Sequence, residues 1–461
     1  MPDQQATERR ASIDRERLAR LIDRERATYA ARHPASRAAF AAAAANLLGG
    51  VPMTWMRMWP GGFPLYLASA HGARLTDIDG HELIDFCLGD TGAMAGHSPA
   101  PVQAAVARQF AVVGGATTML PTQDAAWVAA DLTRRFGPTR WSFTLTATDA
   151  NRWAIRLARQ LTRRPKILVF SYCYHGSVDE SFIVLGPDGP QSRPGNVGAP
   201  VDPSETTRVV EFNDLAALER ELAAGDVAVV LMEPALTNIG IVLPEPGYLE
   251  AVRELTRAAG TLLINDETHT FSAGPGGCTR AWNLDPDIVT IGKSIAGGIP
   301  AGAFGLTTDL ADRILHDQSA DIEDTGGVGG TLAGNALSVA AMRAALERVL
   351  TDAAFTTMIS LADRYTAGVR GVIETRALPW NIVQLGARAE YRFCPQPPRT
   401  GGESDAAGDL QLDEYLHLYT VNRGVLLTPF HNMALMCPAT TEADVDTHTQ
   451  IFATAADELL A

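Results

Sequence analysis

DIVTIGKSIAGGIPAGAFG (287–305) is the stretch that decides the fold, because it joins an apolar strand-like run to a Gly-rich turn. Lys293 follows the run Ile288–Ile291 and stands among small, apolar residues. The chain has few lysines, since its 38 basic residues are mostly arginine. A lysine in such surroundings is easily desolvated, which favours the neutral, nucleophilic amine. Lys293 is therefore the first candidate catalytic residue.

A second apolar run, LLINDETHTF (262–271), places Asp266 at its end. Ligands bind at the carboxyl ends of strands in open α/β sheets, so Asp266 and Lys293 are expected to face one crevice. Alone, each residue is equally well explained as a turn acid or a surface lysine. Together, a lysine that forms a Schiff base and a carboxylate that partners a pyridinium nitrogen predict pyridoxal 5′-phosphate (PLP) as the cofactor.

Short apolar runs alternate with helical stretches from about residue 100 to about residue 340, which predicts an α/β fold. Fully apolar strands indicate a mostly parallel central sheet covered by helices on both faces. The expected strands are KILVF (166–170), VAVVLME (227–233), TLLIND (261–266), DIVTIG (287–292) and GAFGL (302–306). Asp-Gly in DIDGHELIDF predicts a hairpin near residue 80, and the Gly-, Pro- and Ser-rich segments 186–208 and 395–411 are expected to be surface loops.

These patterns divide the chain into four parts. They are an N-terminal helical arm (1–48), the N-terminal part of a small domain (49–98), a large cofactor-binding domain (99–340) and the C-terminal part of the small domain (341–461). A length of 461 residues is too great for one core, which agrees with more than one domain. The small domain is expected to be α+β.

Composition excludes several classes of function. A net charge of −15 with no basic stripe argues against a nucleic-acid partner. Five dispersed cysteines favour a reducing compartment and give no metal-type spacing, so no metal site is expected. No apolar run approaches a membrane span and no signal-peptide pattern opens the chain. The sequence thus predicts a cytoplasmic protein that acts on small molecules.

Several separated motifs resemble, in order, those of the class III (omega-type) PLP-dependent aminotransferases, in the branch of glutamate-1-semialdehyde 2,1-aminomutase. The motifs are GARLTDIDGHELIDFCLGD (72–90), TLTATDANRWAIRLAR (144–159), YCYHGS (172–177), MEPALTNIG (232–240), LLINDETHT (262–270), GKSIAGGIPAGAFG (292–305) and GGTLAGNALS (329–338). Ordered motifs are far more specific than any single one. The resemblance implies fold type I of the PLP-dependent transferases, with Lys293 and Asp266 as catalytic residues.

The resemblance also implies residues that hold the phosphate and the ring. Thr146, Ala147 and Thr148 open a helix, whose first amides would bind the phosphate dianion. Ala147 replaces the family's glycine, so its backbone must adopt an ordinary negative φ. Tyr174 matches the aromatic residue that stacks on the ring and is the third catalytic candidate, with a packed core tyrosine as the alternative.

Further matches carry departures of their own. Thr268 replaces the valine that packs on the opposite ring face, and its hydroxyl needs a partner. We hypothesise that His269 bonds the cofactor's phenolate oxygen or orients Asn238; a buried histidine bonded only to backbone is the alternative. Thr331 matches the residue that reaches the phosphate of the neighbouring subunit, which implies a homodimer with shared active sites.

Substrate recognition is assigned to Arg57 and Trp55 in MTWMRMWPGG and to Arg388 in LGARAEYRF. A guanidinium suits bidentate binding of a carboxylate, although any of these arginines could serve a surface ion pair instead.

The resemblance implies an aminotransferase that moves an amino group between an amino acid or amine and a keto acid, aldehyde or ketone. A ping-pong mechanism through a Schiff base on Lys293 follows. The segments AGAFGLTTDLADRI and DTGGVGG differ from those of the aminomutases and favour this interpretation. The alternatives are an aminomutase, an amino-acid racemase on the same fold and, in a different class, a cofactor-free binding scaffold.

Overall fold

The structure is a computed structural model that describes residues 13–198, 200–316 and 330–461. The chain forms two compact units. Unit 1 comprises Met1–His97, Thr357–Pro397 and Ala407–Ala461, and unit 2 comprises Ser98–Thr356 and Pro398–Ala406. Residues 341–356 and 398–406, which the sequence assigned to the small domain, are grouped with unit 2. The four-part domain division itself stays a prediction.

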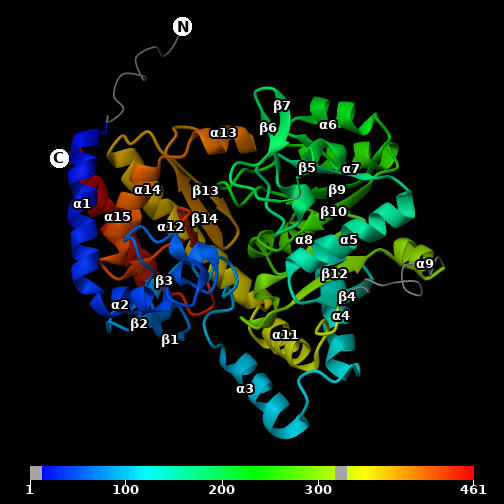
Figure 1. Cartoon of the computed structure of the whole chain (residues 1–461), viewed down its shortest axis with the longest axis horizontal. Helices are drawn as coiled ribbons and strands as arrows, with labels where there is room; N and C mark the ends of the chain where they lie inside the picture. The colour runs from blue at the N-terminus through cyan, green and yellow to red at the C-terminus, as the bar shows by residue number, and fades with distance from the viewer. Residues whose placement is uncertain (1–12, 199, 317–329) are drawn as a thin grey trace. The chain divides into compact units, whose positions relative to one another are not determined.

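Unit 2 contains a seven-stranded sheet in the order β4-β12-β11-β10-β9-β5-β8 (Figure 1). The strands are β4 (Arg140–Thr144), β5 (Lys166–Phe170), β8 (Thr207–Val210), β9 (Val227–Met232), β10 (Leu262–Asp266), β11 (Ile288–Ile291) and β12 (Gly302–Leu306). Only β12 runs antiparallel to its neighbours, so the sheet is mostly parallel as predicted. All five expected strands are present; β4 and β8 were not expected.

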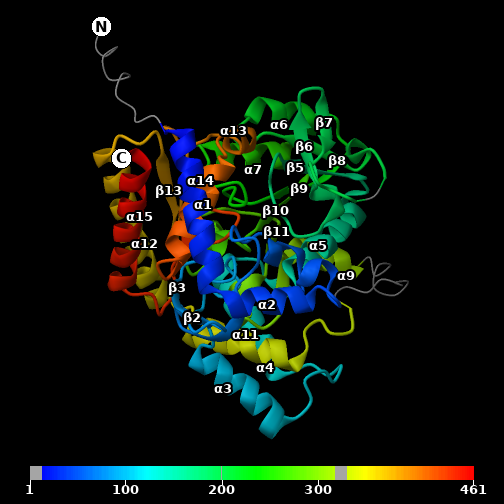
Figure 2. The same ribbon diagram turned by 60° about the vertical axis from the view of Figure 1, so that its left-hand side comes forward.

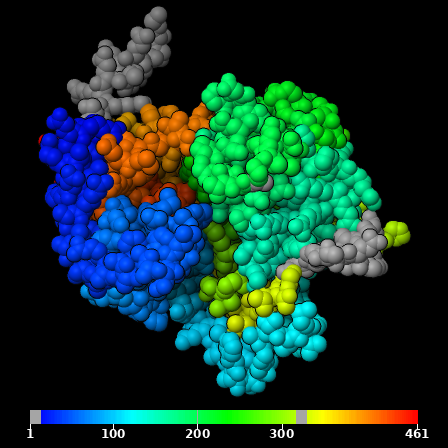
Figure 3. Space-filling model, viewed as in Figure 1, coloured from blue at the N-terminus to red at the C-terminus, as the bar shows by residue number. Residues whose placement is uncertain are grey.

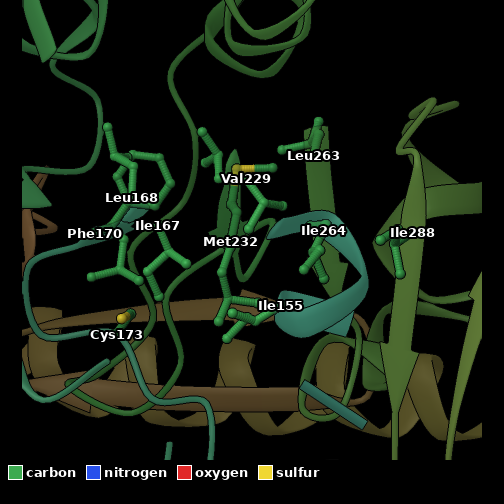
Figure 4. Close-up of a cluster of buried hydrophobic side chains, with 14 of the residues drawn as sticks. Ile155, Ile167, Leu168, Phe170, Cys173, Val229, Met232, Leu263, Ile264 and Ile288 are labelled. Carbon is green, nitrogen blue, oxygen red and sulfur yellow. The ribbon is translucent and has the colours of Figure 1, made fainter. Parts of the chain in front are cut away.

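Helices cover this sheet because their apolar faces pack on strands that are buried along their whole length. The helices of unit 2 are α3 (Ala100–Arg108), α4 (Gln123–Phe136), α5 (Ala147–Thr162), α6 (Leu215–Leu222), α7 (Tyr248–Ala258), α8 (Gly277–Ala281), α9 (Thr308–His316), α11 (Ala336–Arg348) and α13 (Gly401–Ala406). Ile155 of α5 joins the sheet residues Ile167, Val229 and Ile264 in one fully buried cluster (Figure 4). A core of this kind holds the strand ends in fixed positions.

Two expected loops contain regular structure. The segment 186–208 includes most of a hairpin, β6 (Ile183–Gly186) with β7 (Gly189–Ser192). The segment 395–411 includes α13, whose Ser404 hydroxyl donates to the carbonyl oxygen of Ile239. The prediction that these segments lack secondary structure was therefore wrong.

Unit 1 has two small sheets. The first pairs β1 (Leu67–His71), β2 (Arg74–Asp77), β3 (Glu82–Asp85) and β15 (Val425–Leu426), and contains the hairpin expected at Asp79-Gly80. The second pairs β13 (Asn381–Leu385), β14 (Arg388–Arg392) and β16 (Met433–Leu435). This mixture of sheets and helices is α+β, as expected.

The helices of unit 1 are α1 (Arg15–Arg32), α2 (Pro34–Ala43), α14 (Leu410–Val421), α15 (Glu442–Leu460) and most of α12 (Asp352–Thr375). Helix α1 lies against α14 and α15 in Figure 2 and buries Leu18, Ile22 and Tyr29. Glu25 of α1, also buried, accepts hydrogen bonds from Asn422 and Arg423. The N-terminal helix is thus packed into unit 1.

In the part of the chain that the structure describes, no helix combines the length and apolar character needed to cross a membrane.

Candidate active site

Adjacent parallel strands bring Asp266 and Lys293 to the same edge of the unit 2 sheet. Asp266 is the last residue of β10 and pairs with Thr290 of β11, and Lys293 begins a 3₁₀ turn two residues after β11 ends. Lys293 has a left-handed backbone conformation, with φ of 52°. A non-glycine residue in this region carries strain, which is typical of functional sites. The structure therefore places both residues at the carboxyl ends of neighbouring strands, and the crevice between them stays a prediction.

Asp266 is almost completely buried and is held by three donors from different segments. Its Oδ2 accepts hydrogen bonds from Asn151 Nδ2 of α5, at 2.8 Å, and from His175 Nδ1, at 2.9 Å. Its Oδ1 accepts from the backbone amide of Thr268, at 3.1 Å. Asn151 is itself oriented by Thr290, whose hydroxyl donates to Asn151 Oδ1 at 2.6 Å. These contacts fix the carboxylate at one orientation.

The same contacts keep Asp266 ionised. Burial alone would raise the pKa of Asp266, but the hydrogen bond and the charge of His175 outweigh burial and hold the pKa below its ordinary value. For His175, burial opposes the charged ring, whereas Cys173 and Asp266 raise its pKa well above the ordinary value. The pair is therefore carboxylate and imidazolium at neutral pH. A fixed buried carboxylate is the group that keeps a pyridine nitrogen protonated.

The first turn of α5 brings its backbone amides next to Gly292, the residue before Lys293. Ala147 and Thr148 are its first residues, whose amides have no carbonyl one turn earlier to bind. Ala147 has the negative φ that its side chain requires, so the departure from glycine is accommodated. A side chain at Gly292 would place Cβ only 2.8 Å from the Ala147 nitrogen. Glycine at 292 thus keeps this amide open to a phosphate group.

Two threonines of the predicted site behave differently. Thr146 caps α5: its hydroxyl accepts from the amide of Asp149 at 3.2 Å, so the simple N-cap explanation fits its side chain. Thr268 is buried, and its hydroxyl helps to lower the pKa of Asp266. The space that Gly292 leaves beside the Ala147 amide suits a phosphate group, and the ionised Asp266 suits a protonated ring nitrogen. The residues present fit PLP.

His269 lies against Lys293. Its Nε2 is 2.5 Å from Lys293 Nζ, and its side chain is buried. The structure therefore places His269 against the amine of Lys293, a contact that the sequence did not predict. Its proposed bonds to the phenolate oxygen or to Asn238 stay predictions, as does the stacking role of the half-buried Tyr174.

The His269–Lys293 contact predicts a kinetic effect. We expect His269→Met to lower kcat about 3- to 10-fold with little change in KM, because one hydrogen bond of about 0.5–1.5 kcal/mol that positions the amine is lost. Steady-state kinetics of the two holoenzymes measure this effect. Equal kcat values would show that His269 does not position Lys293, and an unchanged cofactor spectrum and spectral pKa would exclude the phenolate role.

The predicted substrate residues all belong to unit 1. Arg57 is exposed, and Trp55 packs on Phe430 with ring centroids 5.5 Å apart. Arg388 is fully buried on β14, where its Nη1 lies 3.4 Å from Thr91 Oγ1. Burial argues against the surface ion pair considered for Arg388. The part of these residues in substrate binding stays a prediction.

Thr331 is exposed on a turn before α11, and its role toward a neighbouring subunit stays a prediction. Sequence reasoning missed two residues, Asn151 and the imidazolium of His175. A signal for both existed, because a buried carboxylate requires donors, and both residues lie in motifs that were already recognised.

Comparisons with known proteins identify the family of the chain. The model of the family "Aminotransferase class-III" matches residues 58–455. A glutamate-1-semialdehyde 2,1-aminomutase of Opitutus terrae is 35% identical over 409 residues, which are 87% of this chain and 93% of that protein. Two solved structures are also similar, one from Pseudomonas aeruginosa PAO1 and one from Sphaerobacter thermophilus.

The Pseudomonas structure is a glutamate-1-semialdehyde-aminomutase with 48% identity and a TM-score of 0.94, covering 97% of this chain and 99% of that one. A variant of a glutamate-1-semialdehyde-aminomutase from the same organism was solved in complex with PMP. The Sphaerobacter structure is an omega-transaminase with 28% identity and a TM-score of 0.83, covering 93% of this chain and 98% of that one. The fold is thus fold type I of the PLP-dependent transferases. The chain belongs to the class III aminotransferase family, and it is an enzyme whose cofactor is pyridoxal 5′-phosphate.

Proposed function

We propose that this enzyme is an aminomutase, which moves an amino group between neighbouring carbons of one substrate, and that glutamate 1-semialdehyde is that substrate. The observation that carries the proposal is the 48% identity to the Pseudomonas aminomutase over 97% of the chain. This proposal replaces the aminotransferase expected from the sequence. A similarity that extends over nearly the whole chain outweighs the differences in the two segments AGAFGLTTDLADRI and DTGGVGG.

The site residues divide the work among themselves. PLP, when bound, withdraws electrons from the carbon that bears the amino group. Asp266 keeps the ring nitrogen protonated, and the amides at the start of α5 hold the phosphate. Lys293 anchors the cofactor and then takes and returns protons at the reacting carbons. His269, at 2.5 Å from Lys293 Nζ, provides a second titratable nitrogen for an exchange that involves two carbons.

One assay tests this proposal. The holoenzyme is incubated with glutamate 1-semialdehyde alone, and 5-aminolevulinate is measured. An aminomutase forms it over many turnovers, because the amino group leaves C2 and returns to C1 of the same carbon skeleton. Lys293→Ala serves as the inactive control. Absence of 5-aminolevulinate, with turnover of other amines, would contradict the proposal.

A second candidate is transfer between two substrates, as first expected. The segments after Lys293 and before Thr331 favour it, because they differ from those of the aminomutases. The similarity to the Sphaerobacter omega-transaminase also agrees with it. This activity requires a separate amino donor and acceptor and gives parallel double-reciprocal lines. Intersecting lines would count against it, and decay of optical rotation in a single amino acid would indicate a racemase.

We also propose a homodimer, supported by an apolar surface on unit 2. Phe110, Val112, Met119 and Leu120 expose between 63% and 78% of their area, although side chains of this kind are usually buried. The segment that carries them forms an outer face of unit 2 in Figure 3 (cyan). The carbonyl oxygen of Ala116 accepts from the amide of Leu337, which joins this segment to the start of α11, six residues after Thr331. A partner that covers this surface would therefore lie near the segment that carries Thr331.

Disrupting this surface should weaken the dimer. Phe110→Glu is expected to raise the dimer dissociation constant about 10- to 150-fold, because burial of such a side chain contributes about 1.5–3 kcal/mol. Sedimentation over a range of concentrations measures the effect. Val197→Glu is the matched control, since Val197 is 97% exposed on a different loop of unit 2. Equal dissociation constants for Phe110→Glu and the unmodified protein would contradict this interface.

A further inference from the structure

Unit 1 contains a compact group of two histidines and one aspartate that the PLP chemistry does not use. His33 lies at the junction of α1 and α2, Asp77 ends β2, and His81 follows in the β2–β3 turn. His33 Nε2 is 3.4 Å and His81 Nδ1 is 3.2 Å from the same oxygen, Asp77 Oδ2. One ligand atom from each residue lies within 4.8 Å of the other two. The three side chains therefore converge on one point.

The hydrogen bonds around the group orient its nitrogen lone pairs. His33 Nδ1 lies 2.8 Å from the carbonyl oxygen of Tyr29, so Nδ1 carries the proton. In the neutral ring the lone pair is then on Nε2, which faces Asp77. Asp77 is in turn oriented by the backbone amide of His81, which donates to Oδ1 at 2.8 Å. A histidine that binds a metal usually donates the N–H of its other ring nitrogen to a group such as a backbone carbonyl, as His33 does.

In the described part of the chain, the ion-pair partners of Asp77 are the two imidazoles of this group. Asp77 is 1% exposed, and among the described residues no lysine or arginine is within ion-pair distance of it. A buried carboxylate that faces a nitrogen lone pair is unfavourable without a cation between them. Asp79, two residues on, is not part of this group. Its carboxylate instead accepts three hydrogen bonds at the start of α2.

We propose that His33, Asp77 and His81 form a binding site for a late divalent transition-metal ion, with Zn²⁺ as the best-fitting member of the class. The histidine nitrogens, 3.4 and 3.2 Å from Asp77 Oδ2, match two edges of a tetrahedral site with bonds of about 2.0–2.1 Å, and all three ligand atoms lie within 4.8 Å of one another. Two imidazoles and one carboxylate suit Zn²⁺, Ni²⁺ or Cu²⁺, whereas Ca²⁺ and Mg²⁺ prefer oxygen ligands alone. His81 is 26% exposed, so water completes the coordination and the ion can enter there.

The site would be structural. Its ligands join the α1–α2 junction to the β2–β3 turn, and Figure 2 shows α2 beside β2 and β3. A bound ion would fix the N-terminal helices to the first sheet of unit 1. The competing explanation is a metal-free cluster in which a proton on His33 bridges to Asp77.

Calorimetric titration with ZnSO₄ tests the site. Untagged holoenzyme is first freed of metal with a chelator, in a buffer that does not coordinate zinc. We expect one Zn²⁺ per chain and a higher Tm with Zn²⁺. His81→Gln should weaken Zn²⁺ binding at least 10- to 100-fold, because even the loss of a residue that only hydrogen-bonds to a ligand lowers metal affinity by that factor. His81 is the ligand to change because it is partly exposed; an unchanged cofactor spectrum verifies the fold.

His71→Gln is the matched control, since His71 is an exposed histidine of the same unit. It should bind Zn²⁺ as the unmodified protein does. Three results would overturn the site: no saturable binding, equal binding by His81→Gln, or an equal loss in His71→Gln. Because His81→Gln contains the same cofactor, zinc held by PLP itself would remain in the variant and would be recognised as the second of these results.

Discussion

Lys293→Ala is expected to lower kcat by about 10³-fold or more, the largest effect of any single substitution in this enzyme. A positioned acid–base group contributes about 10²–10⁴-fold, and under the proposed function Lys293 also anchors the cofactor. It has a left-handed backbone and lies two residues after β11, at the edge of the sheet where Asp266 ends β10. No neighbouring amine can replace it, because the chain's other lysine, Lys166, donates to the carbonyl oxygen of Ser204.

The chain offers a direct measurement of this role. Borohydride makes the lysine–cofactor link permanent, and peptide mass spectrometry then locates it. We expect the label on Lys293 only, no label in Lys293→Ala, and full labelling and activity in the control Lys166→Ala. A label on Lys166, or a Lys293→Ala variant with more than a tenth of the original kcat, would show that the catalytic amine is assigned wrongly.

Much of the fold follows from the sequence because the central strands are apolar along their length. All six residues of β9 are buried, and such a run has few alternatives to a parallel core strand. Strand β4, RWSFT, was missed because four of its five residues are at least partly exposed and their pattern is mixed. Helix α13 was missed because GGESDA has poor helix propensity; Glu403, whose carboxylate accepts from the amide of Arg399, closes its first turn.

The site was predictable only in part. Lys293 and Asp266 are visible because each follows an apolar strand. The donors to Asp266 are not, since Asn151 and His175 are 115 and 91 residues away in sequence. The contact of His269 with Lys293 depends on the turn after β10, and the group of His33, Asp77 and His81 has no spacing typical of metal sites. Contacts of this kind arise from tertiary packing and leave little local pattern.

Asp266→Asn is the second substitution with a large expected effect. We expect kcat to fall about 10²- to 10³-fold, the usual cost of removing one preorganised electrostatic contact. The amide is neutral, so it cannot keep the ring nitrogen protonated, while its size preserves the packing. Kinetics and the visible spectrum of the cofactor measure the change. Asp287→Asn is the control, because Asp287 lies at the opposite end of β11 and pairs with Arg253. Equal losses of kcat in the two variants would show that Asp266 has no particular role in catalysis.

The pH dependence separates the charge of Asp266 from its packing. The lowered pKa of Asp266 gives stability that is present above its ordinary value of 3.8 and is lost as pH falls through the folded pKa. The raised pKa of His175 gives stability that is complete below its ordinary value of 6.5 and is lost as pH rises through the folded pKa. His175→Gln should therefore cost most between these two values, about 3–5 kcal/mol for a broken buried pair, and progressively less at higher pH. Denaturant unfolding of the two proteins across this range measures the difference. If the loss of unfolding free energy in His175→Gln did not change with pH, His175 and Asp266 would interact as neutral groups. The conclusion that Asp266 is ionised would then be wrong.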